Sequence, residues 1–180
     1  SEAYNTFLGV AFPGNQLKIL DYNRCVLDLN GLQHDEILKK FEALGNVSLI
    51  ADNEPQKPTQ KGEIVFYLNH KWYRLTFNPE LRNQTKIADT LDTAILQNYI
   101  LDPIFGIKNP RLDERIDFVG GIHGLEGLEK RCNKDAKLAF ALFPTSSEEL
   151  IKVSDANELM PPKSTWFEPK LLSGMVIKTI

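Results

Sequence analysis

The residues best suited to chemistry lie near the end of the sequence, in the segment Met160–Lys170, which we call the closing segment. Lys163 and Lys170 carry positive charges, and Ser164 and Thr165 add hydroxyl donors. Ammonium groups bind phosphate and carboxylate groups as point charges. The closing segment therefore predicts a binding site for an anionic small molecule. The alternative interpretation is that both lysines are solvated surface residues that pair with nearby carboxylates.

Three prolines and two adjacent aromatic residues set the expected shape of the closing segment. Proline fixes φ and lacks a backbone donor, so Pro161, Pro162 and Pro169 predict a rigid, extended loop. A loop that is ordered before binding loses less entropy when a ligand arrives. Neighbouring side chains of an extended chain face opposite ways. We therefore expect at least one of Trp166 and Phe167 to anchor the loop in the core.

A second set of candidate residues interrupts the apolar, β-prone run from Leu17 to Leu27. This set is Asp21, Tyr22, Asn23 and Arg24, which we call the polar string. Polar groups that are buried in a strand need hydrogen-bond partners. Those partners are either internal, as in a pair between Asp21 and Arg24, or a ligand, and both interpretations stay open. We expect the polar string to lie near the closing segment in space.

A glycine-rich stretch from Gly120 to Gly127 follows a predicted strand and precedes a predicted helix. Phosphates bind at such places because the free N–H groups of a helix N-terminus point at them. Gly121 and His123 are therefore candidate ligand-binding residues. The spacing is not that of a dinucleotide or P-loop motif. The alternative is a tight turn that needs glycine for a positive φ.

Metal and hydrolytic chemistry find little support in the sequence. The three histidines are scattered, and no paired cysteine or histidine motif occurs, so we expect no metal site. Ser164 lacks the G-x-S-x-G frame, and Phe167 stands where an S-x-x-K motif has lysine. Catalytic residues and cofactors therefore stay unassigned.

The composition is that of an ordinary globular protein. A chain of 180 residues suits a single domain, which we expect to span residues 1–180. A net charge of −3 argues against nucleic-acid or membrane partners. No apolar run reaches the roughly 18 residues of a membrane helix, and no basic signal-peptide start is present. We expect a cytoplasmic protein in which Cys25 and Cys132 stay reduced.

Hydrophobic periodicity and turn signals alternate between strands and helices along the chain. They predict an α+β fold with a mixed, mainly antiparallel sheet and three to four helices packed on it. The predicted strands are 6–12, 17–27, 46–51, 63–68, 72–77, 115–119, 137–143 and 175–180. The predicted helices are 34–44, 89–102, one that follows Gly124 and one that follows Thr145. The first two strands would form a hairpin about the turn Pro13-Gly14-Asn15.

Local signals predict where these helices begin and end. Asp89 is expected to cap the second helix, and Asp92 lies in its first turn. The alternative is that Asp89 and Asp92 share a cation. Thr145 and Glu148 fit a capping box for the last helix. Gly45 suits the position just after the first helix.

Both the closing segment and the polar string resemble strings of the family catalogued as domain of unknown function 1015. The resemblance extends over nearly all 180 residues and concerns the C-terminal part of a family whose chains are about twice as long. It implies that this chain is the C-terminal part of a longer parent. It also implies an association with serine biosynthesis, so phosphoserine-like ligands merit testing. The family has no settled activity.

Two functional hypotheses remain. In the first, the chain binds a phosphorylated or carboxylated small metabolite, and as an enzyme or part of one it acts on that ligand. In the second, it is a non-catalytic assembly domain that docks the N-terminal half of its parent or another subunit. An anion in a deep pocket would favour the first, and a flat apolar patch beside the closing segment would favour the second.

Overall fold

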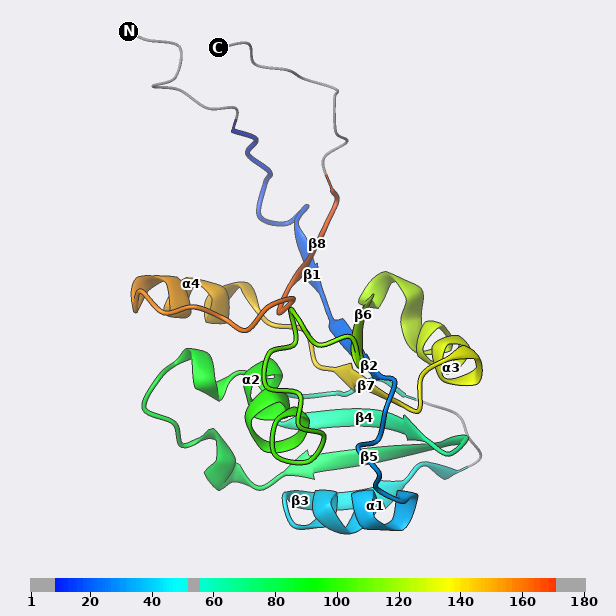
Figure 1. Cartoon of the computed structure of the whole chain (residues 1–180). Helices are drawn as coiled ribbons and strands as arrows, with labels where there is room; N and C mark the ends of the chain where they lie inside the picture. The colour runs from blue at the N-terminus through cyan, green and yellow to red at the C-terminus, as the bar shows by residue number, and fades with distance from the viewer. Residues whose placement is uncertain (1–8, 52–55, 171–180) are drawn as a thin grey trace, which may run out of the picture.

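The computed structural model describes residues 9–51 and 56–170 (Figure 1). Within them, six strands form one sheet in the order β3-β5-β4-β7-β2-β6, and every neighbouring pair is antiparallel. The strands are β2 (Tyr22–Val26), β3 (Gly45–Leu49), β4 (Glu63–Leu68), β5 (Lys71–Phe77), β6 (Ile116–Gly120) and β7 (Leu138–Leu142). The helices are α1 (His34–Glu42), α2 (Asp92–Leu96), α3 (Gly124–Lys134) and α4 (Ser147–Asp155). The predicted α+β fold is thus confirmed.

The side chains of the central strands are buried on both faces of the sheet. Because successive side chains of a strand point to opposite faces, the core has two parts, one on each face. In β4, Phe66 packs with Phe41 of α1 at 5.0 Å between ring centroids, on the face that α1 and α2 cover. Its neighbours Val65 and Tyr67 face the other way, toward Leu128 of α3. Helices therefore cover both faces of the sheet (Figure 1).

The predicted hairpin between β4 and β5 shows how local residues fix the register. Asn69 and His70 both have positive φ, 49° and 60°. Two such residues make the turn that matches the twist of the flanking strands. As a result Leu68 pairs with Lys71.

The predicted strand over residues 17–27 is divided at Asp21. Lys18–Leu20 (β1) leaves the sheet and pairs antiparallel with Trp166–Glu168 (β8) to form a two-stranded ribbon. The carbonyl of Asp21 instead accepts the N–H of Gly121 at 2.7 Å. The opening hairpin was therefore a wrong prediction, because residues 9–12 form no strand and β1 has β8 as its partner. The predicted strand at 175–180 lies outside the described residues.

The predicted helix over residues 89–102 consists of three pieces. A 3₁₀ turn (Ala88–Thr90) precedes α2, and a π-helical turn (Gln97–Leu101) follows it. The cap predicted at Asp89 is wrong, because the N-cap position of α2 belongs to Leu91. Asp92 is buried and engaged within the protein, since it accepts the N–H of Gly62 at 2.9 Å and pairs with Arg82 at 2.7 Å.

Two further boundary predictions were wrong by small shifts. The capping box of α4 uses Ser146 and Glu149, one residue later than predicted. Gly45 begins β3 instead of ending α1, whose C-cap is Ala43. Glycine fits there because a Cβ would lie 2.1 Å from the carbonyl oxygen of Thr76 on β5.

Two further 3₁₀ turns lie within the described residues, at Pro79–Arg82 and Gly121–His123. None of the helices in the described part of the chain is long and apolar enough to cross a membrane.

Candidate cationic cavity

Arg24 joins the polar string to the closing segment. Its side chain is buried, and its guanidinium donates to the carbonyl oxygens of Tyr22, Pro162 and Lys163, at 3.3 Å to Pro162 and 3.0 Å to Lys163. These bonds confirm that the two strings lie together. Desolvation lowers the pKa of Arg24 to about 9, so the group is still a cation at neutral pH.

The polar string alternates between two sides of its strand. Tyr22 and Arg24 face the closing segment, whereas Asp21 and Asn23 bond to each other at 2.6 Å on the opposite side. Asn23 also accepts the N–H of Leu142 at 3.0 Å, and Asp21 pairs with Lys57 at 2.9 Å. The Asp21–Arg24 pair considered as an alternative is therefore not formed. The structure satisfies Asp21 and Asn23 internally and leaves only Tyr22 and Arg24 beside the closing segment.

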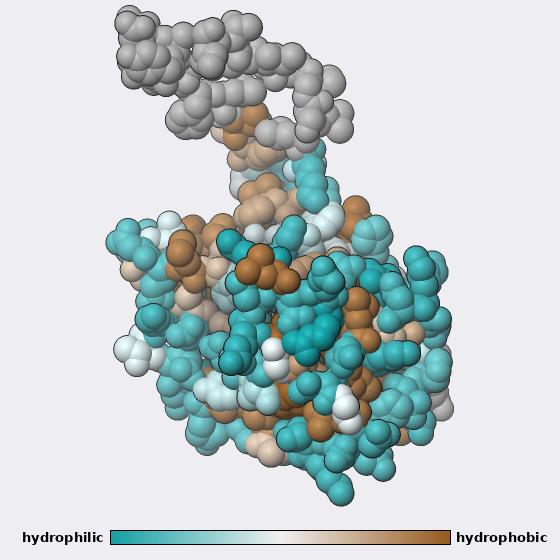
Figure 2. Space-filling model, in the orientation of Figure 1, coloured by the Kyte–Doolittle hydropathy of each residue, from teal (hydrophilic) through white to brown (hydrophobic). Residues whose placement is uncertain are grey.

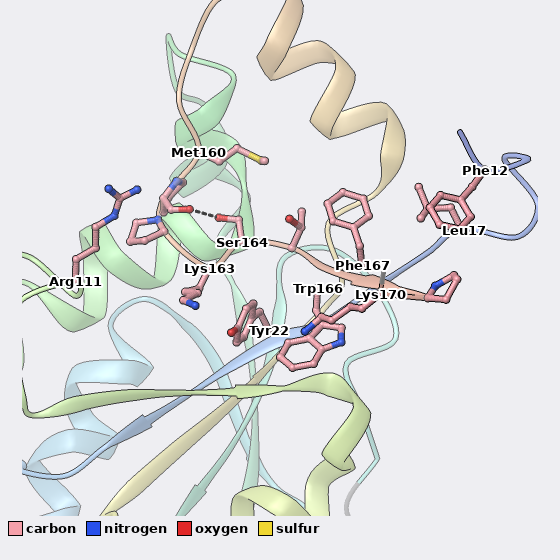
Figure 3. Close-up of a pocket in the computed structure, with 14 residues that line it drawn as sticks. Phe12, Leu17, Tyr22, Arg111, Met160, Lys163, Ser164, Trp166, Phe167 and Lys170 are labelled. Atoms are coloured by element: carbon pink, nitrogen blue, oxygen red, sulfur yellow. Dashed lines mark hydrogen bonds between the residues drawn. The ribbon is translucent and has the colours of Figure 1, made fainter. Parts of the chain in front are cut away.

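Ser164 fastens the closing segment to the body. Its hydroxyl donates to the carbonyl of Pro161 at 2.7 Å and lies 3.1 Å from Oγ1 of Thr93 (Figure 3). Its own carbonyl accepts the hydroxyl of Thr145 at 3.1 Å. The side chain is buried, so these contacts hold the loop in place.

A cavity of about 890 Å³ opens beside this loop. Most of its lining comes from the closing segment, to which Tyr22, Phe12, Leu17 and Arg111 add. Three of its lining residues are cations, Arg111, Lys163 and Lys170, and no described lining residue is a carboxylate. We call this space the cationic cavity. Arg111 was missed by the sequence analysis, because it lies in the connection between α2 and β6, far from either string.

Aromatic rings support the two lysines. The ammonium nitrogen of Lys163 lies 5.5 Å from the centroid of the Tyr22 ring, and that of Lys170 lies 3.1 Å from the Trp166 ring. Both distances are within the range of cation–π attraction. Tyr22 and Trp166 pack edge to face at 5.2 Å. The wall thus combines positive charge with aromatic surface. Thr165 also lines the cavity.

Trp166 is the expected aromatic anchor. Its ring covers Gly120, where an added Cβ would lie 2.4 Å from the ring. Phe167, the next residue, lines the cationic cavity as well. Glycine at position 120 therefore allows the indole to lie directly on β6.

Gly121 and His123 lie apart from the cationic cavity. A Cβ at Gly121 would lie 2.4 Å from Oδ1 of Asp21, so glycine there permits a close approach of two segments. His123 lines a different cavity of about 410 Å³, which shares Trp166 with the cationic cavity.

The thiols and the other histidines lie elsewhere. Cys25 and Cys132 are free, as expected, and burial raises the pKa of each to about 12. They are therefore thiols at neutral pH. His34 and His70 line one cavity of about 230 Å³ with Cys132, although the sequence separates them widely. In the part of the chain that the structure describes, no group of three His, Cys, Asp or Glu residues is arranged to hold a metal ion.

Fold and cavity together define a small α+β protein with a cationic cavity at one end of its sheet. Residues 1–94 match the family described as protein of unknown function (DUF1015), and the chain belongs to this family. The match contains the polar string but not the closing segment. No curated protein sequence matches the chain significantly.

Solved structures with a similar fold include a free serine kinase in complex with AMP, with 13% sequence identity and a TM-score of 0.51. A point mutant of a free serine kinase in complex with AMP has 12% sequence identity to this chain and a TM-score of 0.50. In both comparisons 86% of this chain is covered, and 55% of the other chain. A conserved hypothetical protein from Pyrococcus furiosus matches at 15% identity, with a TM-score of 0.48, covering 84% of this chain and 56% of its own. The chain therefore spans little more than half the length of these neighbours, and the likeness shows the shared fold alone.

Proposed function

We propose that the chain binds a phosphorylated or carboxylated small molecule in the cationic cavity. The observation that carries this proposal is the lining itself. Three cations and, among the described residues, no carboxylate line one cavity in a chain whose net charge is −3. A cleft lined by one sign of charge concentrates ligands of the opposite sign.

Two of the three lining cations, Arg111 and Lys163, have distinct expected roles. Arg111 presents a planar fork that suits two oxygens of one phosphate, whereas Lys163 supplies a point charge. The backbone carbonyl of Lys163 is already held by Arg24, so little of the loop needs ordering on binding. Buried Arg24 adds a further positive charge beneath the loop, and no carboxylate among the described residues pairs with it.

The aromatic residues that line the cavity indicate what the ligand carries besides its anionic group. Tyr22 and Phe167 offer surface on which a flat ring can pack, whereas the Trp166 ring already lies on Gly120 and has the Lys170 ammonium against it. A phosphate joined to an aromatic base therefore fits the lining. AMP, which the similar kinase structures contain, is one such molecule and is a reasonable first probe. Phosphoserine is the second probe, as the family resemblance implies.

Catalysis on the bound ligand is a separate requirement. A general base or nucleophile must lie within hydrogen-bond reach of the reacting group. The described lining contains no His, Cys, Asp or Glu. We propose that this chain supplies ligand binding, and that a reacting His, Cys, Asp or Glu comes from another part of a longer parent chain.

Assembly is the second candidate function, and the ribbon of β1 and β8 favours it. The ribbon projects from the body (Figure 1), and hydrophobic residues are frequent along it, whereas the visible face of the body is mostly hydrophilic (Figure 2). Phe12 and Leu17, which precede β1, line the cationic cavity. An N-terminal half docked on this ribbon would cover the cavity mouth and complete a site.

Paired ligands test the binding proposal directly. Calorimetric titration would compare AMP with adenosine, and phosphoserine with serine, in each case changing only the phosphate. We expect the phosphorylated member of a pair to bind and the member that lacks the phosphate to bind at least about tenfold more weakly, a difference of about 1.4 kcal/mol. Equal affinities within both pairs would remove the charge-based proposal.

A further inference from the structure

A second cavity, of about 540 Å³, adjoins the cationic cavity, and we call it the adjacent cavity. The two cavities share Arg111, Pro162 and Lys163 in their linings. Two of the three cations of the proposed site therefore stand at the boundary between two spaces. An anionic group placed between Arg111 and Lys163 has room for a substituent on either side.

The adjacent cavity differs from its neighbour in charge. Asp113 is the only carboxylate in the described lining of either cavity. Its Oδ1 accepts two bonds from Arg115, from the backbone N–H and from Nε, both at 2.9 Å, and its Oδ2 accepts one from Nη2 at 2.7 Å. These bonds lower the pKa of Asp113, so it stays ionised at neutral pH.

An ionised carboxylate accepts hydrogen bonds and donates none. Two carboxylate oxygens offer about four acceptor positions, and Arg115 occupies three of them. The position that remains suits a hydroxyl or ammonium group. The adjacent cavity therefore offers an acceptor to a hydroxylated or amino group beyond the anion.

We infer that the ligand has two parts joined through an internal anion, as in a nucleoside diphosphate sugar. This inference rests on the proposed function and specifies its ligand class. The aromatic part lies against Tyr22 and Phe167, the diphosphate lies between Arg111 and Lys163, and a hydroxylated part lies beside Asp113. A ligand that ends in phosphate fills the first cavity and leaves the second to water.

Three ligands that differ only beyond the diphosphate test this inference by calorimetry. ADP ends at the diphosphate. Its β-methyl ester carries a small group without hydroxyls on the terminal phosphate, and ADP-ribose carries a hydroxylated sugar there. We expect ADP-ribose to bind at least about tenfold more tightly than the methyl ester. Asp113→Asn should abolish that gain and leave the affinity for ADP within about twofold, because Asn keeps one acceptor oxygen for Arg115.

Glu114→Gln is the matched control, because Glu114 is exposed and lines neither cavity. Melting curves show whether the Asp113→Asn variant is folded. If it is not, the affinities of the unaltered protein for the three ligands still test the inference. The β-methyl ester bound as tightly as ADP-ribose, with both dependent on Lys163, overturns the two-part ligand and leaves the proposed function intact. Binding of none of the three, nor of AMP and phosphoserine, overturns both.

Discussion

Arg24 in β2 donates a hydrogen bond to the carbonyl of Lys163, 139 positions later in the chain, at 3.0 Å. A second bond from the same nitrogen reaches Pro162. Lys163 itself has a positive φ of 58°, a conformation that is uncommon for lysine. The buried guanidinium thus holds the backbone of the residue whose ammonium group faces the cavity.

Arg24→Lys tests this relationship. Lysine keeps the charge, but its ammonium lacks the planar fork that reaches several carbonyls at once. We expect a loss of about 1.5–3 kcal/mol in unfolding free energy, which is typical of hydrogen bonds to a charged group. Urea denaturation measures it. A variant as stable as the unaltered protein would show that the carbonyl bonds contribute little.

Ser164→Ala tests whether the Ser164 hydroxyl stabilises the fold or binds the ligand. The change leaves the carbonyl of Pro161 and the hydroxyl of Thr93 without their partner. We expect a loss of about 1–3 kcal/mol in stability. Affinity for AMP per folded molecule should stay within about twofold, far less than the tenfold change that 1.4 kcal/mol produces. Ser154→Ala, on the exposed side of α4, is the control and should melt normally. A tenfold loss of affinity with unchanged stability would instead assign Ser164 to the ligand.

The lowered pKa of Glu63 contributes to the loss of stability that we expect in acid. Burial alone raises the pKa of Glu63, but bonds from Thr59 and Arg74 outweigh burial and lower it below 4.5. The folded state therefore binds fewer protons than the unfolded state in this range. This contribution to stability is complete above pH 4.5 and is lost as the pH falls through the lowered pKa.

Glu63→Gln removes that titration. Between pH 6 and pH 3, we expect the melting temperature of the variant to fall less steeply than that of the unaltered protein. Parallel melting curves at each pH make the comparison. Identical slopes would mean that other carboxylates, such as Asp113 and Asp117, carry the acid response.

Local patterns predicted most of the fold, because their causes lie within a few residues. The hairpin at Asn69 and His70 is an example, since both residues adopt the positive φ that the turn requires. The capping box shows the limit of such patterns. Thr145 with Glu148 and Ser146 with Glu149 both fit the motif, but Ser146 caps the helix and the Thr145 hydroxyl bonds to the distant carbonyl of Ser164.

The site was predicted less completely, because its geometry depends on distant contacts. Lys163, Lys170, Thr165 and Tyr22 line one cavity, as a shared site requires. Arg111 could not be foreseen, because no local motif surrounds it. The role of Arg24 was also hidden, since its partners are backbone carbonyls, which every residue possesses.

The central claim is that the cationic cavity binds anions through Lys163. The most direct measurement is calorimetric titration of AMP into the unaltered protein, Lys163→Ala and Lys152→Ala. Lys152 is an exposed lysine of α4 that does not line the cavity, so its variant removes the same charge elsewhere. We expect Lys163→Ala to bind at least about tenfold more weakly, with an unchanged melting temperature, and Lys152→Ala to bind normally. Equal affinities of all three proteins for AMP would contradict the claim.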